Sequence, residues 1–430
     1  ATQHQLPPQM ACALVFRRRV QSVGLRCWVA GASVPVAHSS SLGQFEGGIT
    51  FRTLRAMSGS ADSVKVKPAQ VRSDSRTADG QTFSMQTPRK FLDAPVYVWP
   101  PLYFDLGKGK LSALITVTAA AGFVVAIPAG IHVPLSTLVA TSTGTLLASM
   151  GASAFNQIIE RTNDKTMVRT ARRPLPSGRI SVVHATSVAC LSSAAGVGVL
   201  LAFTNPLASS LAAANVAIYA LCYTPMKQYS IWNTWVGAIV GAIPPMIGWA
   251  AATGGLDAGA WILGGILFSW QMPHFLALAY MMRNDYRTGG YKMMPGEAGS
   301  PGLTRATKAV MRHCLYLQGL SVGSVGLGLV TLPFAMEATV LNLAFFYLAL
   351  KFHTAGQDGG AGGAGRTNTA ARRLFLSSLA YLPILLALMA IHRAPPVPPP
   401  EDAIAASATA CPYLEATRVV AAADAAVAGG

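Results

Sequence analysis

The amino-acid sequence predicts an all-α polytopic membrane protein, a bundle of about nine transmembrane helices around a central cavity. Of its 430 residues, 52% are hydrophobic and only 12% are charged, and the mean hydropathy is +0.41. Soluble domains rarely contain so few charged residues. Apolar stretches recur along the chain, and several reach the roughly 20 residues that a helix needs to cross a bilayer. We therefore expect the lipid bilayer to be a permanent partner of this chain.

The expected spans are the apolar stretches, separated by polar or glycine-containing segments. They cover residues 111–131, 136–155, 181–203, 206–223, 234–252, 259–282, 309–332, 337–352 and 373–391. The eighth stretch is short for a span. Together with their loops they form an expected membrane domain over residues 95–393, in which the many glycine and alanine residues favour close helix packing.

The distribution of basic residues predicts the topology. Lysine and arginine cluster before the first span and in every second loop, whereas the segments near 132–135, 204–205, 253–258 and 333–336 contain neither. The positive-inside rule therefore places the N-terminus and all basic loops on one side, with the C-terminus opposite. Topology thus accounts for the formal net charge of +16, and we expect no nucleic-acid partner.

The two ends of the chain do not resemble membrane segments. Residues 1–90 are rich in arginine and serine and contain no acidic residue before Glu46, which is typical of an organelle transit peptide followed by a disordered leader. We expect import into the mitochondrion, with the chloroplast as the alternative, so that the basic side and the N-terminus face the matrix from the inner membrane. Residues 394–430 are expected to form a disordered tail, and the glycine-rich stretch at 359–365 a flexible insertion.

The first candidate site lies where the second span meets water. Asn156, Glu160 and Asp164 recur at every fourth residue and therefore share one helical face. Such oxygens suit Mg²⁺, and guanidinium groups bind phosphate oxygens bidentately. A solvated helix end is the alternative, but acidic residues at the edge of a bilayer are costly and usually functional. The basic residues that follow are Arg161, Lys165, Arg169, Arg172 and Arg173.

A second charged cluster follows the sixth span, on the same side as the first. It contains Arg283, Asp285 and Tyr286. Two clusters on one side of a bundle suggest a shared cavity. Asp285 is expected to contact either Mg²⁺ or an arginine, and the structural alternative is a simple pair with Arg283 or Arg287.

Three further polar residues are candidates for the site. Lys227 precedes the fifth span and is expected to meet a diphosphate from a third direction, the alternative being an interfacial anchor. Asn233 either lines the site or caps the fifth span. His274 follows Pro273 inside the sixth span, and an ionisable group there indicates a functional site, although a hydrogen-bonded core histidine is the commoner case.

These segments together resemble a known family. The pattern Asn156-x-x-x-Glu160-x-x-x-Asp164, with Met-x-Arg-Thr-x-x-Arg-Pro-Leu at 167–175, resembles the first polyprenyl-diphosphate motif of the UbiA-like intramembrane prenyltransferase superfamily. Most members have Asp at the middle position, and Glu160 resembles the haem branch. Tyr-Thr-Pro-x-Lys at 223–227, Gly-Ala-Ile-Pro-Pro at 241–245, Trp-Gln-x-Pro-His-Phe at 270–275 and Arg-x-Asp-Tyr-x-x-Gly-Gly-x-x-Met-x-Pro at 283–295 resemble that branch in the same order.

The resemblance implies transfer of a farnesyl group from farnesyl diphosphate to a vinyl group of haem B (protohaem IX). The product is haem O, used in haem A synthesis and cytochrome c oxidase assembly, so haem A synthase and assembly factors are candidate partners. The implied cofactor is Mg²⁺, held by Asn156, Glu160 and Asp164, with Asp285 as a further catalytic residue. The implied diphosphate ligands are Arg161, Lys165, Arg169, Arg172, Arg173, Lys227 and Arg283, and the implied haem contacts are His274 and Tyr286.

Other functions remain open at this point. Within the superfamily, the acceptor could be a quinone precursor or a chlorophyll-type ring; Gly289 replaces the second Asp that most members have after Asp285, and this departure favours the haem branch. A transporter of anions would show inverted-repeat symmetry and charges deep in the spans, whereas these charges lie at helix ends. A non-catalytic haem-delivery scaffold would not depend on Glu160 or Asp164.

Overall fold

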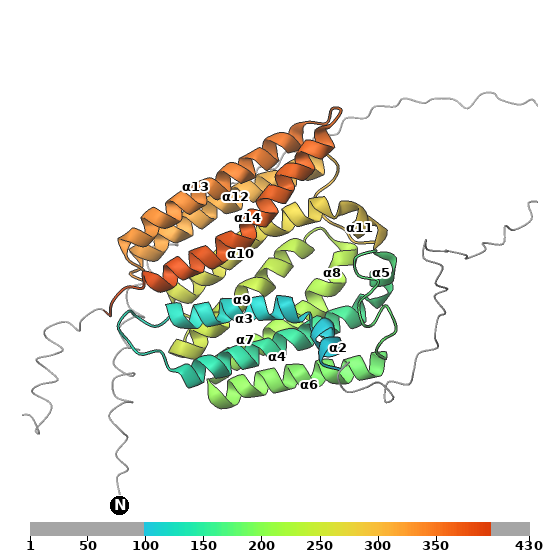
Figure 1. Cartoon of the computed structure of the whole chain (residues 1–430). Coiled ribbons are helices and arrows are strands. Elements are labelled where there is room, and N and C mark those ends of the chain that lie inside the picture. Colours follow the sequence, from blue (N-terminus) through green and yellow to red (C-terminus); the bar gives the residue numbers. More distant parts are fainter. Residues whose placement is uncertain (1–98, 397–430) are drawn as a thin grey trace, which may run out of the picture. The chain divides into compact units, whose positions relative to one another are not determined.

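The computed structural model describes residues 99–396, whose regular elements are helices apart from one β-bridge between Val330 and Arg393 (Figure 1). The expected transit peptide and nearly all of the expected tail lie outside these residues. The helices are α2 (Trp99–Leu106), α3 (Gly109–Val125), α4 (Leu135–Ile159), α5 (Arg161–Thr166), α6 (Val182–Phe203), α7 (Pro206–Ala217), the π-helix η4 (Ile218–Tyr223), α8 (Thr224–Tyr229), α9 (Asn233–Thr253), α10 (Ala258–Met281), α11 (Arg283–Thr288), α12 (Pro301–Gly326), α13 (Leu332–Gln357) and α14 (Gly363–Ile391).

The all-helical membrane architecture is confirmed, but the count of nine spans is not. Among the described residues, seven stretches are long and apolar enough to cross a membrane, or eight if α2 and α3, which are bent by 66°, form one span. The remaining expected span, 309–332, is shifted in the structure to α12. Ser300 accepts a hydrogen bond from the backbone N–H of Leu303, and Pro301 begins the helix. This N-terminal cap starts α12 early, before Arg305 and Lys308. The helix also ends at Gly326, so it contains Arg312 and His313 but not the apolar residues 327–332, which makes it less apolar than the expected span.

The bundle closes on itself through contacts between helices distant in sequence. α3 packs on α4 and α9, α10 packs on α9 and α12, and α14 packs on α13, α10 and again α3. Figure 1 shows α12, α13 and α14 grouped on one side of the bundle and α3, α4 and α6 on the other. The largest apolar core lies mainly among α10, α12, α13 and α14 and contains the buried rings of Tyr280, Phe352 and Tyr381.

Glycine residues allow the closest helix approach in the N-terminal half. A Cβ atom on Gly248 of α9 would lie 1.8 Å from the backbone oxygen of Ala119 on α3. On the facing helix, a Cβ on Gly122 would lie 2.2 Å from the backbone oxygen of Pro245. The α3–α9 contact is therefore made by backbone against backbone, as expected for glycine-rich membrane helices.

We expect Gly248→Ala to lower the stability of the bundle by about 1–3 kcal/mol, because the added methyl group must separate α3 from α9. The measurement is the thermal unfolding midpoint of the detergent-solubilised protein. Gly198→Ala is the matched control, since a Cβ there meets no atom within 4 Å. Equal unfolding midpoints for both variants would show that the α3–α9 contact does not limit stability.

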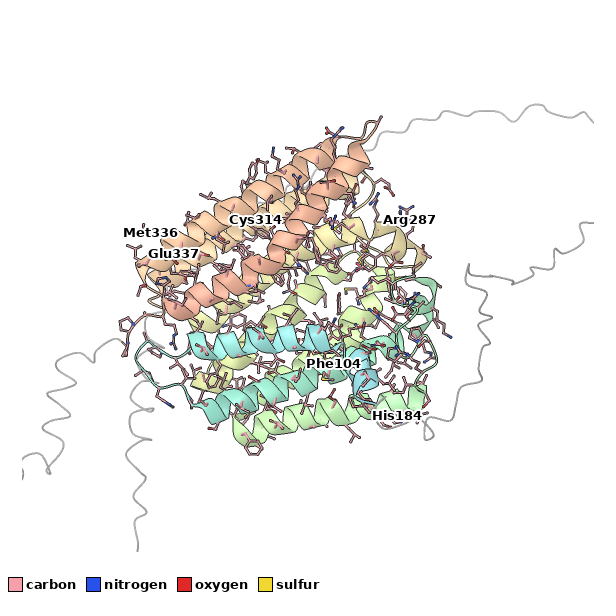
Figure 2. The ribbon with its side chains drawn as sticks, in the orientation of Figure 1. Phe104, His184, Arg287, Cys314, Met336 and Glu337 are labelled. Atoms are coloured by element: carbon pink, nitrogen blue, oxygen red, sulfur yellow. The ribbon has the colours of Figure 1, made fainter. Side chains whose placement is uncertain are left out.

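The loops at the basic end of the bundle contact one another. The turn before α3 contacts the end of α4 through Lys108 and Asn156, and α8 contacts the same end through Lys227 and Glu160. The segment before α12 contacts the end of α13, where the Gly299 N–H donates to the Gly356 oxygen. Figure 2 shows Arg287 at this end and Glu337 at the other. The alternation of helix directions therefore places the basic loops together, as the positive-inside rule predicts.

The opposite end is joined mainly by backbone hydrogen bonds. The Thr331 N–H donates to the His392 oxygen at 2.8 Å, and the Ala129 N–H donates to the Ala394 oxygen at 3.0 Å. Arg393 donates to the backbone oxygens of Val124 and Ile127, both at 3.1 Å. The Val124 oxygen also accepts the Ile127 N–H, so this guanidinium group adds a second hydrogen bond there and binds the Ile127 carbonyl just beyond the end of α3.

Candidate functional site

The three residues of the first motif lie where α4 gives way to α5. α4 ends at Ile159, and Glu160 joins the two helices with φ −85° and ψ 4°. The i to i−4 pattern continues across this junction, because Glu160 N–H donates to the Asn156 oxygen at 2.9 Å and Asp164 N–H donates to the Glu160 oxygen at 2.8 Å. The three side chains are buried, with exposures of 0%, 4% and 0% for Asn156, Glu160 and Asp164.

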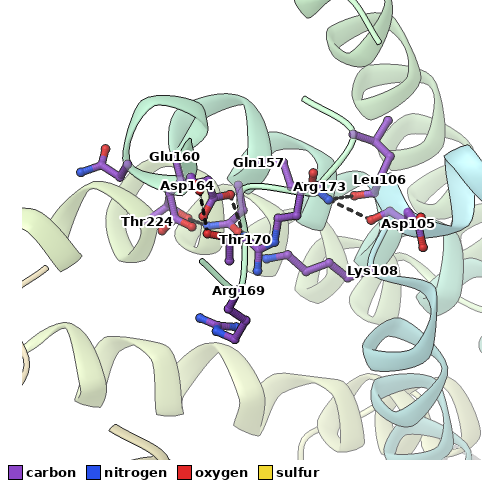
Figure 3. A network of polar contacts seen from close by, with 12 residues as sticks. Asp105, Leu106, Lys108, Gln157, Glu160, Asp164, Arg169, Thr170, Arg173 and Thr224 are labelled. Carbon is purple, nitrogen blue, oxygen red and sulfur yellow. Dashed lines mark hydrogen bonds and ion pairs between the residues drawn. The ribbon is translucent and has the colours of Figure 1, made fainter. Parts of the chain in front are cut away.

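Each of these three side chains accepts a hydrogen bond from a cation on another segment. Figure 3 shows Glu160 and Asp164 with Arg173 and Lys108 beside them. The Lys227 Nζ donates to Glu160 Oε1 at 2.8 Å, and an Arg173 nitrogen donates to Asp164 Oδ2 at 2.7 Å. The third acceptor, Asn156 Oδ1, receives a hydrogen bond from Lys108 Nζ. The ion pairs are buried or half-buried, so that each member lacks the hydration it would have at an exposed surface.

Two threonines hold the motif in place. The Asn156 Nδ2 donates to Thr224 Oγ1 at 3.1 Å, which joins α4 to the start of α8. The Thr170 hydroxyl donates to the backbone oxygen of Asp164 at 2.9 Å and so closes the chain over α5. The preceding π-helix η4 alters the helical phase of this segment before Thr224, and π-helical turns frequently occur at functional sites.

The electrostatics favour an ionised Glu160 and leave one carboxylate oxygen free. Burial alone would raise the pKa of the Glu160 carboxyl, but Lys227, Lys108 and Arg173 hold it below its usual range. Asp164 Oδ1 is buried and has no hydrogen-bond partner among the described residues. A buried carboxylate oxygen without a partner destabilises the folded protein unless a ligand binds to it. The described residues contain no group of three or more His, Cys, Asp or Glu side chains that could hold a metal ion, so any such ion needs amide or ligand oxygens as well.

The second cluster lies beside the first. The Asn163 Nδ2 donates to the Gly289 oxygen at 2.7 Å, which joins α5 to the end of α11. Arg169 approaches Asp285 Oδ2 at 3.6 Å, and its guanidinium lies 5.9 Å from the centre of the Tyr286 ring. Burial raises the pKa of Tyr286, which keeps the phenol protonated. The expected closeness of the two clusters is therefore observed.

Several predicted diphosphate ligands lie at the edge of the cluster or outside it. Arg283 pairs with Glu297 at 3.0 Å, although the sequence suggested Asp285 as its structural partner. Arg287 binds the same carboxylate at 2.5 Å. The side chains of Arg161, Lys165 and Arg172 are exposed, and none forms an ion pair with another described residue.

Asn233 neither caps α9 with its side chain nor belongs to the charged cluster. Its Nδ2 donates to the Ser230 oxygen at 2.6 Å and to the Lys292 oxygen at 2.8 Å. The Lys292 N–H in turn donates to the Lys227 oxygen at 2.8 Å. Asn233 therefore ties the segment after α11 to the α8–α9 turn, and α9 begins without a side-chain cap.

His274 lies in an aromatic setting between α10 and α14. Its Nδ1 is 2.7 Å from Ser378 Oγ, and its ring lies 4.9 Å from that of Trp270 and 4.8 Å from that of Phe375. The described partners of His274 belong to these two helices and not to the charged cluster. The hydrogen-bonded core interpretation thus accounts for one ring nitrogen and for two aromatic contacts of the imidazole.

Lys108 also belongs to the cluster, although no motif of the sequence marks it. This residue occupies the left-handed region, with φ 49° and ψ 51°, in the turn between α2 and α3. Its neighbours must be small, because a Cβ on Gly107 would lie 2.7 Å from Met150 and one on Gly109 would lie 2.1 Å from Phe104. The Gly-Lys-Gly sequence in the segment before the first apolar stretch was the available signal, but only the packing of α3 beside α4 brings Lys108 to Asn156.

Tyr291 is a second residue near the first motif that the sequence patterns did not predict as part of the site. Its side chain is 7% exposed, and its hydroxyl group has no hydrogen-bond partner among the described residues. Burial raises the pKa of this phenol, and the negative charges of Glu160 and Asp164 raise it further, which places the ring in the field of the first motif.

We expect Lys108→Met to weaken the farnesyl transfer that the resemblance implies by about tenfold to a hundredfold, because hydrogen bonds to charged groups contribute roughly 1.5–3 kcal/mol. The measurement is haem O formed by membranes containing equal amounts of protein. Lys110→Met is the matched control, since Lys110 is exposed and lies two residues away. Equal losses in the two variants would remove Lys108 from the site.

A partly open cavity lies among α3, α4, α7, η4 and α9, with a volume of about 70 Å³, or roughly 560 Å³ counting its solvent-open part. Its lining is mostly apolar and includes Leu111, Ile115, Val216, Val240 and Ile247. Ser153, which also lines it, lies three residues before Asn156 on α4. The apolar cavity and the charged cluster are therefore neighbours along the same helix.

The model of the UbiA prenyltransferase family matches residues 113–364 of this chain. The chain belongs to the UbiA prenyltransferase family. The superfamily resemblance carried by the first motif is therefore confirmed, and the UbiA bundle accounts for an all-helical architecture with the polar motifs at one end.

The UbiA chain is similar to proteins named protoheme IX farnesyltransferase. It is 45% identical to the mitochondrial protein of Homo sapiens over 306 residues, which are 71% of this chain and 65% of the relative. It is 42% identical to the mitochondrial protein of Arabidopsis thaliana, covering 68% of this chain and 64% of the relative. The bacterial protein of Opitutus terrae is 35% identical and is covered to 94% of its length. The chain thus spans slightly less than two thirds of the human and plant relatives.

Solved structures share the UbiA fold. One, from work on digeranylgeranylglyceryl phosphate synthase in membranes, has a TM-score of 0.55 at 14% identity and covers 68% of this chain and 98% of the other. The apo structure of a UbiA homologue from Aeropyrum pernix K1 has a TM-score of 0.50 at 20% identity, covering 66% of this chain and 97% of the other. At these identities the likeness concerns the fold alone.

Proposed function

We propose that this chain transfers the farnesyl group of farnesyl diphosphate to a vinyl group of haem B, giving haem O. The observation that carries the proposal is the buried cluster of Asn156, Glu160 and Asp164, each paired with a cation, at one end of a UbiA bundle. The names of the human and plant relatives support the choice of substrates. Membership of a prenyltransferase family argues against the transporter alternative.

We further propose that Asn156, Glu160 and Asp164 hold Mg²⁺ and that Asp285 supports them. The donor set fits this ion, because Mg²⁺ binds through one or two carboxylates together with substrate phosphates. The unpartnered Asp164 Oδ1 supplies an unused ligand atom. When bound, Mg²⁺ would neutralise charge on the diphosphate leaving group.

The proposed role of the basic residues is to stabilise that leaving group. Negative charge develops on the diphosphate as the allylic C–O bond breaks, and preorganised cations stabilise it more in the transition state than in the ground state. Lys108, Lys227 and Arg173 already converge on the motif from three segments. Arg169 lies between the two clusters, and the proposed ligands Arg161, Lys165, Arg172 and Arg283 would contribute longer-range attraction.

The apolar cavity is proposed to hold the farnesyl chain and exclude water from its cationic end. The π electrons of the haem vinyl group form the new C–C bond to the first carbon of the farnesyl group as diphosphate departs. Water then adds its oxygen to the resulting cationic carbon and loses a proton, which leaves a hydroxyethylfarnesyl side chain. Tyr286 and His274 remain proposed haem contacts.

The proposed location is the mitochondrial inner membrane, with the basic end of the bundle in the matrix. The mitochondrial relatives and the apolar helices support a multi-pass protein of a mitochondrial membrane. Residues 1–90 would then serve as the transit peptide and leader. Haem A synthase and cytochrome c oxidase assembly factors are proposed to receive the product.

The test is haem extraction and chromatography from cells that lack their own haem O synthesis and express the membrane domain, residues 95–393. We expect haem O to appear with the wild-type domain and not with the empty vector. Well-expressed membrane protein without haem O would overturn the haem assignment and favour another acceptor.

A further inference from the structure

A groove separate from the charged cluster lies where α13 ends and α14 begins. It has a volume of roughly 1520 Å³, counting its solvent-open part. It is formed by the last turns of α13, the first turns of α14 and the glycine-rich stretch between them. Gly362 precedes α14 with φ +78°, and a Cβ on Gly365 would meet no atom within 4 Å, so the groove is open at Gly365.

Three cations and one carboxylate line this groove. Lys351 lies on α13, and Arg366 and Arg373 lie on α14, all exposed. Asp358, the fourth charged residue, pairs with Arg366 at 3.3 Å. Three positive charges and one negative charge leave a net charge of +2. The groove therefore favours an anion with two negative charges.

Exposed apolar side chains continue the groove toward the middle of the helices. Leu343, Tyr347 and Lys351 follow one another at intervals of four residues and so share one face of α13. The Tyr347 ring lies 5.3 Å from the Lys351 nitrogen and is 55% exposed. On α14, the exposed Leu376 lies one turn beyond Arg373. The groove thus has basic side chains at the helix ends and apolar side chains toward the middle of the helices. This arrangement complements a phospholipid, which has an anionic headgroup and apolar acyl chains.

We propose that this groove binds the headgroup of an anionic phospholipid carrying two phosphates, with its acyl chains along Leu343 and Leu376. Basic pockets between membrane helices at the side where positive loops gather are suited to such headgroups. Arginine binds phosphate oxygens bidentately, and tyrosine is favoured at the membrane interface. Since none of the groove residues belongs to the farnesyl-transfer cluster, the proposal does not depend on the proposed function.

The test measures lipid retained by the full protein after purification in detergent, by native mass spectrometry and lipid phosphorus analysis. The added lipids are cardiolipin with two phosphates, phosphatidylglycerol with one, and zwitterionic phosphatidylcholine. We expect Arg366→Ala and Arg373→Ala each to weaken cardiolipin binding about fivefold, which corresponds to about 1 kcal/mol per basic residue. Arg372→Ala is the matched control, because Arg372 is exposed on the same helix but does not line the groove.

A substitution that is expected to strengthen lipid binding distinguishes an effect on this groove from a general loss of structure. We expect Asp358→Asn to strengthen cardiolipin binding, because it removes the carboxylate that competes for Arg366. Equal losses in Arg372→Ala and Arg373→Ala, or equal retention of phosphatidylcholine and cardiolipin, would overturn the proposal. Displacement of the lipid by millimolar inorganic diphosphate would also overturn it and indicate a site for free phosphates.

Discussion

Asp164→Asn is expected to lower haem O formation by about 10²–10³-fold, because losing one preorganised charge-stabilising group has an effect of that size. The change keeps the shape of a side chain that is 0% exposed. It removes the negative charge that pairs with Arg173 at 2.7 Å and alters a carboxylate whose Oδ1 has no hydrogen-bond partner among the described residues. The measurement is haem O per unit of membrane protein, taken over a range of Mg²⁺ concentrations.

The matched control is Asp105→Asn. Asp105 is 56% exposed and lies 3.8 Å from Arg179. Exposed ion pairs of this kind contribute little to stability, so losing this carboxylate should not disturb the fold. We expect this variant to retain haem O formation and the wild-type dependence on Mg²⁺. Full activity in Asp164→Asn at every Mg²⁺ concentration would keep the proposed reaction and refute the proposed metal ligands.

Lys227→Met is expected both to abolish most activity and to lower the free energy of unfolding by about 3–5 kcal/mol, because it leaves the Glu160 charge buried and unpaired. Glu160 is 4% exposed, and the Lys227 ammonium is its ion-pair partner at 2.8 Å. The measurements are the thermal unfolding midpoint in detergent and haem O formation. Adding the neutral substitution Glu160→Gln distinguishes the loss of stability from the loss of activity.

The double variant Lys227→Met with Glu160→Gln removes both charges at once. We expect it to recover most of the lost stability, since replacing both members of a buried pair is often neutral, while haem O formation remains low. Recovery of activity in the double variant would show that neither charge takes part in the reaction. A single variant as stable as the wild type would mean that water reaches Glu160.

The ion pair also has a defined dependence on pH. The nearby cations hold the pKa of Glu160 below its usual range, so the carboxylate is stabilised in the folded protein relative to the unfolded chain. This contribution is fully present above the ordinary carboxyl pKa and is lost as the pH falls through the lowered value. We therefore expect the unfolding midpoint of the wild type to fall more on acidification through that range than that of the double variant, which keeps Glu297 and its lowered pKa but lacks the Glu160 contribution.

Helical periodicity and span alternation were sufficient to predict much of the site. The four-residue spacing placed Asn156, Glu160 and Asp164 together, and alternation placed Lys227 on their side of the bundle. The structure brings Lys227 to Glu160 at 2.8 Å. These inferences needed only the geometry of one helix and the direction of the others.

The remaining features depend on packing that local patterns do not encode. Lys108 reaches Asn156 because a left-handed turn between two glycines directs it there. Glu297 forms an ion pair with Arg283 because the chain after α11 returns toward that helix. The early start of α12 was encoded by the Ser300–Pro301 cap, but hydropathy alone extended the seventh span past Gly326 to residue 332.

The buried motif contains its own counter-ions. Each of its three acceptor side chains already receives a proton donor from a lysine or arginine of the same chain. A divalent cation that binds here through Asp164 Oδ1 and shares the other oxygens would weaken these hydrogen bonds, which makes the ammonium and guanidinium groups more available to an anion beside the cation. Metal and diphosphate would consequently each favour the other's binding, and the internal cations by themselves neutralise the carboxylates at the edge of the bilayer.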